Sequence, residues 1–394
     1  MANKDLTVLL TLWDRVPCTF RWMAYADKIN FPFKVLIADG GSDESVTTIL
    51  GNKAAYPNVD YEYIRYPYDA NPTDYYVKVL DALNRVETPF VVLADNDDFF
   101  VVDGLLRSIE FLKSHSDFSS CRGVIAGFKI QPHSSDGELS NVYGRDVSFV
   151  RQVYPEQSTL EETAAGRVRN YCANYRATWY DVFRTEQAQE SFRILRDVDT
   201  QDLILSQHIP MLLGAIAGKI QVDSYTYLFR QLEGVSSVDK TETKEKTDLF
   251  DRMLLDTWSA DFKGFLDVIS NAIAEKDSIS KDEAARQVRS CYRQLMTPGL
   301  VQNLMGSIPR SRSIRMAEKF HSLTRPARTV ARKLSGRGSA GAIANGSQQF
   351  IPASRLAAAD QDFRSIYEFL ANPPPSIRAS TEHPSAHSRE EVAI

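Results

Sequence analysis

Three aspartates at the end of one apolar run are the residues of this sequence best suited to bind a metal ion. Asp95, Asp97 and Asp98 stand within four positions of one another, directly after the run 90–94, and Asn96 lies between them. Carboxylates this close repel one another unless a cation joins them, and hard oxygen ligands suit Mg²⁺ or Mn²⁺ carrying a phosphate group. The sequence therefore predicts a site for a metal-bridged diphosphate. The alternative is an acidic turn whose aspartates cap the following helix.

A second acidic group, Asp39, follows the apolar run 33–38 and precedes two glycines, Gly40 and Gly41. Glycines let the backbone turn sharply and allow a ligand to come close. A nucleobase or a ribose could therefore bind beside Asp39. The alternative is a plain turn between a strand and a helix.

The apolar runs before these acids are expected to be strands of one sheet. Segments rich in apolar and β-branched residues alternate with helical patterns at the spacing of βαβ units. The predicted strands span 6–12, 33–38, 61–66 and 90–94, and the predicted helices span 18–29 and 75–86. This alternation predicts an α/β fold with a mostly parallel central sheet, in which ligands bind beyond the carboxyl ends of the strands. The absence of a GxGxxG or P-loop motif disfavours a dinucleotide or P-loop nucleotide site.

Beyond residue 120 the alternation gives way to longer segments. We expect strands at 121–130 and 220–230, a helix from Asp202 to Gly214 interrupted at Pro210, and helices at 248–273, 281–295 and 357–370. The predicted division is a catalytic α/β domain (1–240), a helical extension (241–307), a basic region with a flexible linker (308–347), a C-terminal helix (348–372) and a disordered tail (373–394). The extension should pack on the catalytic domain or on a second subunit, which would make the protein a homo-oligomer.

Composition and charge indicate an ordinary soluble chain of 394 residues, with a net charge of -5 and 43% hydrophobic residues. Four scattered cysteines, no signal peptide and no apolar run of membrane length predict a reducing cytoplasm. In the segment 309–338, nine lysines and arginines face a single acid, Glu318. This segment is predicted to bind anionic lipid headgroups on the inner face of the membrane, and a solvated linker is the alternative. Nucleic acid is not expected as a partner.

The order of these motifs resembles the nucleotide-sugar domain of family 2 glycosyltransferases. The similarity is carried by LTVLLTLWDR at 6–15, VLIADGGS at 35–42 and TPFVVLADNDD at 88–98, and it covers roughly the first 240 residues. It implies the GT-A fold and a metal-dependent, inverting transfer of a sugar from a nucleoside diphosphate sugar, for which the family favours a UDP-sugar. The acceptor would be a glycan or a lipid-linked glycan, in the assembly of bacterial surface polysaccharide.

The resemblance also implies roles for individual residues. Asp39 would bind the nucleobase, Asp95 the ribose or the sugar, and Asp97 the divalent ion, together with Asp95 and Asp98. The rest of the donor pocket would be Thr11, Asp14, Arg15, Asn96 and Arg230, the last of which pairs with a phosphate through its fork. Three positions depart from the family pattern, because Thr11 replaces a proline, Gly40 an acid and Leu232 a histidine. Gln231 is the candidate to substitute for that histidine.

An inverting transfer also needs one carboxylate that takes the proton of the acceptor hydroxyl. The resemblance places Gln201-Asp202 at the Glu-Asp pair of the family, which makes Asp202 the predicted catalytic base and Asp199 the second choice. The structural alternative is that Thr200 or Asp199 caps the helix that begins here and that Asp202 lies in its first turn, where a negative charge favours the helix dipole. Two rival functions stay open. One is a nucleotidyltransferase, which should have a glycine-rich loop that 12–17 lacks, and the other is a non-catalytic nucleotide- or glycan-binding protein.

Overall fold

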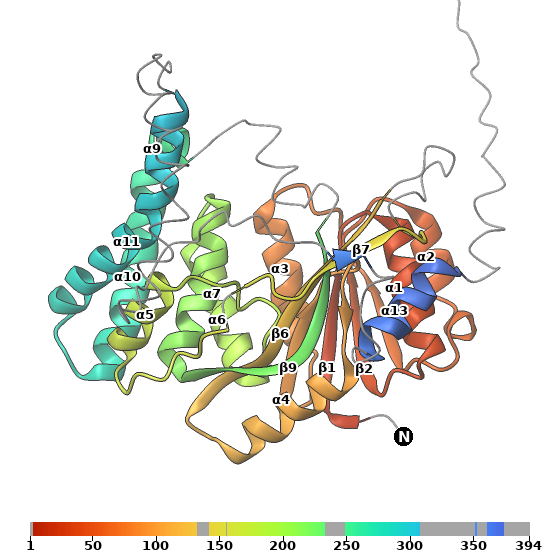
Figure 1. Cartoon of the computed structure of the whole chain (residues 1–394). Helices are drawn as coiled ribbons and strands as arrows, with labels where there is room; N and C mark the ends of the chain where they lie inside the picture. Colours follow the sequence, from red (N-terminus) through yellow and green to blue (C-terminus); the bar gives the residue numbers. More distant parts are fainter. Residues whose placement is uncertain are drawn as a thin grey trace, which may run out of the picture.

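Four parallel strands form one half of the central sheet. The computed structural model describes residues 3–131, 142–154, 156–232, 249–307, 351–352 and 361–373 of the chain. The parallel half is β3 (Tyr61–Arg65), β2 (Phe33–Asp39), β1 (Asn3–Leu12) and β4 (Phe90–Ala94), in that spatial order (Figure 1). These are the four strands predicted from the sequence. The predicted α/β class is confirmed.

The other half of the sheet is mixed. Its long strands are β6 (Phe118–Ile130) and β9 (Lys219–Gln231), which run parallel to each other and confirm the two later predicted strands. The short strands, all antiparallel to a neighbour, are β5 (Phe99–Phe100) on β9, β7 (Val147–Val150) on β6, β8 (Val182–Arg184) between β4 and β6, and β10 (Ile351–Pro352) on β7. Because β5 pairs with the end of β9, the turn between β4 and β5 lies beside Arg230.

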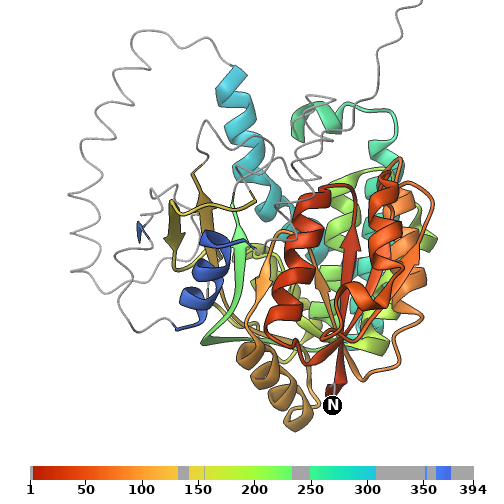
Figure 2. The same ribbon diagram turned by 90° about the vertical axis from the view of Figure 1, so that its right-hand side faces the viewer.

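Helices cover both faces of the sheet (Figures 1 and 2). Successive side chains of a strand point to opposite faces, so Val8 and Leu10 of β1 pack into one apolar core and Leu9 into another. The first core contains α1 (Val16–Lys28), α2 (Glu44–Leu50) and α4 (Val102–Ser114). The second contains α3 (Pro72–Leu83), α5 (Ala164–Ala173), α6 (Thr185–Val198), α7 (Leu203–Ala217), α10 (Trp258–Asp277) and α11 (Lys281–Ser307). A short 3₁₀ helix, η1 (Lys53–Ala55), follows α2.

The predicted helical extension is present and packs on the α/β part of the chain. Phe265 and Ile269 of α10 and Val288 of α11 are buried in the same core as Val91 of β4. Nothing in these contacts fixes the domain boundaries, which stay predictions. No helix within the described ranges is long and apolar enough to cross a membrane.

Two predicted helices differ from the structure. The helix expected at 248–273 is divided into α9 (Leu249–Met253) and α10, with turns in between in which the amide of Leu254 donates to the carbonyl of Asp251. The predicted interruption at Pro210 was also wrong, because α7 continues through it. Nearly every residue of α7 from Leu205 onward is buried, so packing on all sides holds this helix despite the hydrogen bond that proline cannot make.

The last helix, α13 (Gln361–Ala371), returns to the N-terminal part of the chain and confirms most of the helix predicted at 357–370. Phe363, Ile366, Phe369 and Leu370 are buried in a third core. The ring centre of Phe369 lies 5.2 Å from that of Tyr25 in α1, and Figure 1 shows α13 near α1. The predicted linker, the predicted tail from residue 374 onward and the basic segment 309–338 lie outside the described residues.

Buried His208 of α7 should make the stability of the fold depend on pH. Burial, helped by the charge of Arg252, lowers the pKa of this imidazole to about 4. The unfolded chain binds a proton near pH 6.5, so stability is lost as the pH falls from 6.5 towards 4, by about 2 kcal/mol between pH 7 and 5. In urea unfolding at pH 7 and pH 5, the free energy of unfolding of His208→Gln should not show this loss. The same change at exposed His115 should retain it, and equal pH slopes for wild type and His208→Gln would contradict the assignment.

Candidate metal and nucleotide site

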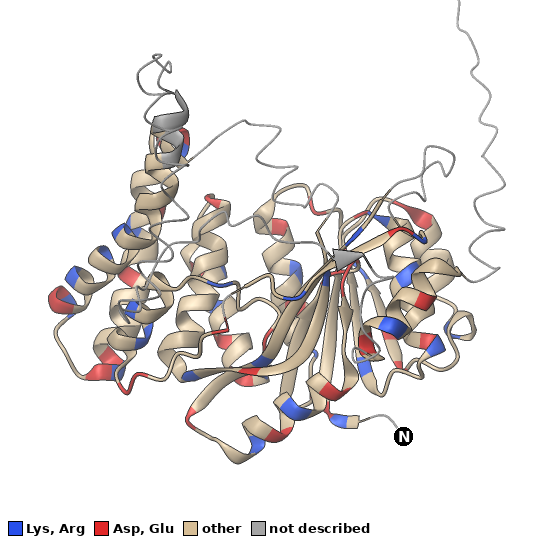
Figure 3. Cartoon of the chain, viewed as in Figure 1, with Lys and Arg blue, Asp and Glu red and all other residues tan. Residues whose placement is uncertain are grey.

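The three aspartates after β4 converge on one point. One carboxylate oxygen from each of Asp95, Asp97 and Asp98 lies within 4.8 Å of the others, and these residues are called the acidic turn below. Acidic and basic residues meet at this end of the central strands (Figure 3). Burial raises the pKa of Asp95 and of Asp98, and the neighbouring charge of Asp97 adds to both shifts. Such crowding is relieved by a cation, so this oxygen-only donor set fits Mg²⁺ or Mn²⁺.

Asn96 ties the acidic turn to the start of α1. Its amide nitrogen donates to the hydroxyl of Thr19 at 2.9 Å and lies 3.3 Å from the carbonyl oxygen of Asp14. Arg21, fully buried, holds the turn from behind through a 2.8 Å hydrogen bond to the carbonyl oxygen of Asp97. The acidic turn is therefore held in place by α1, and Asn96 provides part of this support through its hydrogen bonds.

Two arginines neutralise part of the charge of the acidic turn. Arg15 donates to Asp97 at 2.7 Å, and Arg230 lies 3.7 Å from Asp98. Their side chains are 23% and 27% exposed, so both arginines are partly accessible from solvent. Asp98 also accepts the backbone amide of Gln231 at 3.0 Å. Whether the side chain of Gln231 replaces the expected histidine stays a prediction.

The loop that carries Arg15 has an unusual backbone. Asp14 and Arg15 both have φ of 56°, in the left-handed region that side chains with a Cβ rarely adopt. The carboxylate of Asp14 is fixed by the amide and the hydroxyl of Ser42, each at 3.0 Å. Thr11, at the end of β1, makes a hydrogen bond of 3.1 Å with the hydroxyl of Tyr75. Strain of this kind persists where neighbouring contacts enforce it, and it is often found at ligand sites.

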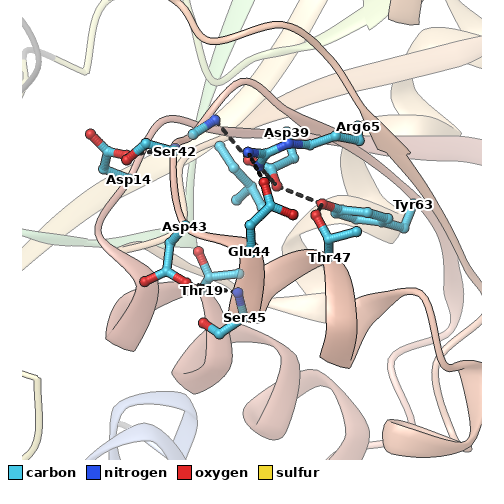
Figure 4. A network of polar contacts seen from close by, with 12 residues as sticks. Asp14, Thr19, Asp39, Ser42, Asp43, Glu44, Ser45, Thr47, Tyr63 and Arg65 are labelled. Carbon is cyan, nitrogen blue, oxygen red and sulfur yellow. Dashed lines mark hydrogen bonds and ion pairs between the residues drawn. The ribbon is translucent and has the colours of Figure 1, made fainter. Parts of the chain in front are cut away.

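Asp39 lies at the end of β2 and is held by three donors (Figure 4). The amide of Gly41 donates at 2.8 Å, the hydroxyl of Tyr63 at 2.6 Å and the guanidinium of Arg65 at 2.7 Å. Burial and the hydrogen bond to Asp39 raise the pKa of Tyr63 to about 12, so Tyr63 remains a donor at neutral pH. The carboxylate is thus fixed two strands from the acidic turn, with β1 between them.

The sequence analysis missed a buried ion pair beside Asp39. Lys78 of α3 pairs with Asp69, and its ammonium also donates to the carbonyl oxygen of Leu12 at 2.9 Å. A Cβ on Gly40 would lie 2.4 Å from the carboxyl atoms of Asp69, so Asp69 fills the space that a side chain at position 40 would need. Burial raises the pKa of Asp69 to about 6 although Lys78 opposes this shift. Asp69 lies outside regular structure, and no periodic pattern marks it in the sequence.

Two tyrosines, also missed, hold Arg230 and the acidic turn together. The hydroxyl of Tyr180 donates to Asp95 at 2.6 Å. The guanidinium of Arg230 lies 4.9 Å from the centre of the same tyrosine ring and donates to the hydroxyl of Tyr154. Tyr180 therefore touches both a candidate metal ligand and the candidate phosphate-binding arginine.

The two candidate bases have different environments. Asp202 caps α7 by accepting the amides of Ile204 and Leu205, at 3.0 and 2.9 Å. Arg252 of α9 also donates to both of its oxygens, each at 2.8 Å, and the Asp202 side chain is only 6% exposed. Asp199 is exposed and ends α6 with a left-handed backbone. Among the described residues, no hydrogen bond or ion pair joins Asp202 to the acidic turn, and Asp202 itself, rather than Thr200 or Asp199, is the N-cap of α7.

Comparisons with known proteins return structural neighbours only. No family model and no curated protein matches the chain. The structure of S. aureus TarS 1–349 is similar over 74% of this chain and 72% of that chain, with 13% identity and a TM-score of 0.48. The mannosyltransferase PcManGT from Pyrobaculum calidifontis, in complex with GDP-Man and Mn²⁺, is similar over 83% and 85%, with 10% identity and a TM-score of 0.38. Similarity at this level assigns no activity to the chain.

Proposed function

We propose that the chain is a glycosyltransferase that binds a nucleoside diphosphate sugar at the carboxyl edge of its parallel strands, with Mg²⁺ or Mn²⁺ as cofactor. The observation that carries this proposal is the convergence there of three carboxylates, within 4.8 Å, beside Arg15 and Arg230. The carboxylates offer oxygen ligands to a hard divalent ion, and the guanidinium groups can pair with phosphate oxygens. Asp39 offers an acceptor for an N–H of the nucleobase.

The acidic turn would hold the ion, which when bound stabilises the charge of the departing diphosphate. We assign Asp97 the leading role, supported by Asp95 and Asp98, because its side chain is 12% exposed against 1% for Asp98, while Asp95 already accepts the hydroxyl of Tyr180. Arg15 and Arg230 would contact the phosphates from opposite flanks of the acidic turn. Thr11, Asp14 and Asn96 would shape the pocket by fixing the ends of β1 and β4.

The resemblance noted in the sequence supports a UDP-sugar as donor, a glycan or lipid-linked acceptor and an inverting transfer in surface polysaccharide assembly. A cytoplasmic location, peripheral on the inner face of the membrane, and a homo-oligomeric state remain predictions of the same kind. The segment 309–338, to which membrane contact is assigned, lies outside the described residues.

Calorimetric titration of the purified full chain with a panel of nucleoside diphosphates, with and without Mn²⁺, tests the proposal. We expect one nucleotide to bind in a metal-dependent manner. The matching sugar nucleotide should then be hydrolysed slowly in the absence of an acceptor. Failure of every nucleotide to bind in the presence of Mn²⁺ or Mg²⁺ would overturn the proposal.

Asp202→Asn should abolish most of the transfer while leaving donor binding unchanged. A general base contributes about 10²- to 10⁴-fold to a rate, and asparagine still caps a helix well. Sugar transfer and donor affinity are measured on the same preparation. If Asp199→Asn loses transfer and Asp202→Asn does not, the base is Asp199, and if both retain it, neither residue is the base.

A non-catalytic nucleotide-binding protein is the second candidate function. The observation that favours it is the fork of Arg252 on Asp202, because a carboxylate whose oxygens are both occupied cannot accept a proton until that contact opens. Suppose that a nucleotide binds in a metal-dependent manner, but its sugar nucleotide is neither hydrolysed nor used to glycosylate any acceptor tested. This result would support a non-catalytic nucleotide-binding protein.

A further inference from the structure

Exposed apolar side chains gather at one end of the molecule. Ten large apolar side chains are exposed among the described residues, and six of them belong to α9, the turn after it and the end of α11. These six, called the apolar tip below, are Phe250, Met253, Leu254, Leu255, Val301 and Leu304. The other four are scattered over the rest of the surface. Leu254 is 67% exposed, which is the largest value of the ten.

The two parts of the apolar tip lie side by side. A Cβ on Gly299 of α11 would be 3.9 Å from a methyl group of Leu249 in α9, so the two helices touch there. Val301 and Leu304 follow within two turns of Gly299. Figure 1 shows α9 and this end of α11 together, projecting away from the sheet. A projecting apolar group of this size indicates an interaction surface, since isolated exposed apolar residues are normal but clusters are not.

The sequence that follows indicates what the surface contacts. The helix α11 ends at Ser307, and the next thirty or so residues carry nine lysines and arginines against one acid. An apolar surface that is followed in the sequence by a dense run of positive charge suits the interface of a bilayer with anionic headgroups. A second copy of the chain fits less well, because it would bring two strongly basic segments together.

We propose that the apolar tip inserts into the headgroup region of an anionic lipid bilayer. The surface stands independently of the proposed enzymatic function. If that function also holds, the tip places the membrane beside the candidate base, because Arg252 of α9 contacts Asp202 directly. An acceptor carried on a lipid would then approach from the membrane side.

Vesicle co-sedimentation of the full chain tests the proposal. The probes are phosphatidylcholine vesicles and vesicles in which about one third of the lipid is phosphatidylglycerol. We expect wild type to sediment only with the anionic vesicles. Leu254→Glu/Leu255→Glu and Val301→Glu/Leu304→Glu should each weaken partitioning roughly 10-fold or more, since the apolar contact is lost and the added carboxylates repel anionic lipid. Leu106→Glu/Leu160→Glu, at exposed apolar positions elsewhere, is the matched control and should bind like wild type.

The outcomes separate the alternatives. Wild type that stays in the supernatant with both vesicles, or tip variants that sediment like wild type, would overturn the proposal. A concentration-dependent dimer that the Leu254→Glu/Leu255→Glu change dissolves would also overturn it and identify a second copy as the occupant. Circular dichroism and nucleotide binding, recorded on each variant, show that the fold is intact and keep a failure here distinct from a failure of the proposed function.

Discussion

Asp97→Asn is expected to eliminate metal-dependent nucleotide binding while the protein remains folded. Asparagine has nearly the same shape as aspartate but no charge, and Asp97 is the proposed leading metal ligand, with a side chain more exposed than that of Asp98. Changes outside the first coordination sphere already reduce metal affinity about 10- to 100-fold, so loss of a direct ligand should cost roughly 100-fold or more. Calorimetric titration of Mn²⁺, and of the nucleotide at saturating Mn²⁺, measures both effects.

The control for this change is Asp103→Asn. Asp103 lies in the first turn of α4, is 65% exposed and pairs with Arg107, so it resembles Asp97 in having an arginine partner but lies outside the acidic turn. Its replacement should leave both affinities unaltered. If Asp97→Asn bound Mn²⁺ and nucleotide as tightly as wild type, the acidic turn would not be a metal site. Its aspartates would then have only a structural role, as helix caps and partners of arginine.

Arg122→Met should destabilise the protein by about 3–5 kcal/mol, the usual cost of removing one partner of a buried ion pair. Arg122 of β6 and Asp181 are fully buried, with 3.2 Å between the guanidinium Nε and a carboxylate oxygen. Ser120 donates to the other oxygen at 2.8 Å, and Arg176, also buried, is the second positive charge nearby. The remaining arginine and the hydroxyl cannot fully compensate a carboxylate that has lost its contact partner. Urea unfolding at pH 7 measures the change.

A double replacement distinguishes the contribution of the ion pair to stability from the contribution of side-chain packing. Arg122→Met/Asp181→Leu removes both charges, and buried pairs replaced by apolar side chains often regain stability. It should therefore be more stable than Arg122→Met alone. Arg107→Met breaks an exposed pair with Asp103 and should cost no more than about 1 kcal/mol. Equal losses for Arg122→Met and Arg107→Met would show that Asp181 is neutral or reached by water.

This pair also shapes the candidate site. Asp181 directly follows Tyr180, whose hydroxyl donates to Asp95 and whose ring supports Arg230. The carbonyl of Tyr180 accepts the buried hydroxyl of Tyr227 at 2.7 Å. We expect nucleotide affinity to fall in Arg122→Met at temperatures well below its unfolding, because the segment that carries Tyr180 is then held less firmly.

The strands and their acidic ends could be predicted because the signal is local. Runs of apolar residues buried on both faces mark β1, β2 and β4, and each ends in polar residues at the same edge of a parallel sheet. The remaining site residues depend on contacts between distant segments. Asp95 and Tyr180 are 85 positions apart, and nothing in the spacing of either predicts the other. The contact between Gly40 and Asp69 likewise could not be predicted from the sequence, because it forms only when the chain folds.

The two errors in helix prediction have one cause, which is that apolar spacing does not report what a side chain packs against. Leu254 and Leu255 continue the apolar pattern of 248–273, yet both are exposed and lie in the turn between α9 and α10. Pro210 opposes a helix locally, but the neighbours that bury α7 outweigh it. Tertiary packing decided both cases.

The position of α13 has a consequence for how the protein is made. The carbonyl of Leu370 in α13 accepts the amide of Gly144, the carbonyl of Val142 accepts Arg21, and Arg21 holds the backbone of Asp97. The support of the acidic turn thus includes residues synthesised roughly 270 positions after it. At translation rates of about 5–20 residues per second, this delay is roughly 15 to 55 seconds. During that time the side chains that pack on α13, such as those of Tyr25 and Phe149, lack this cover, so we expect the nascent chain to bind chaperones until α13 emerges.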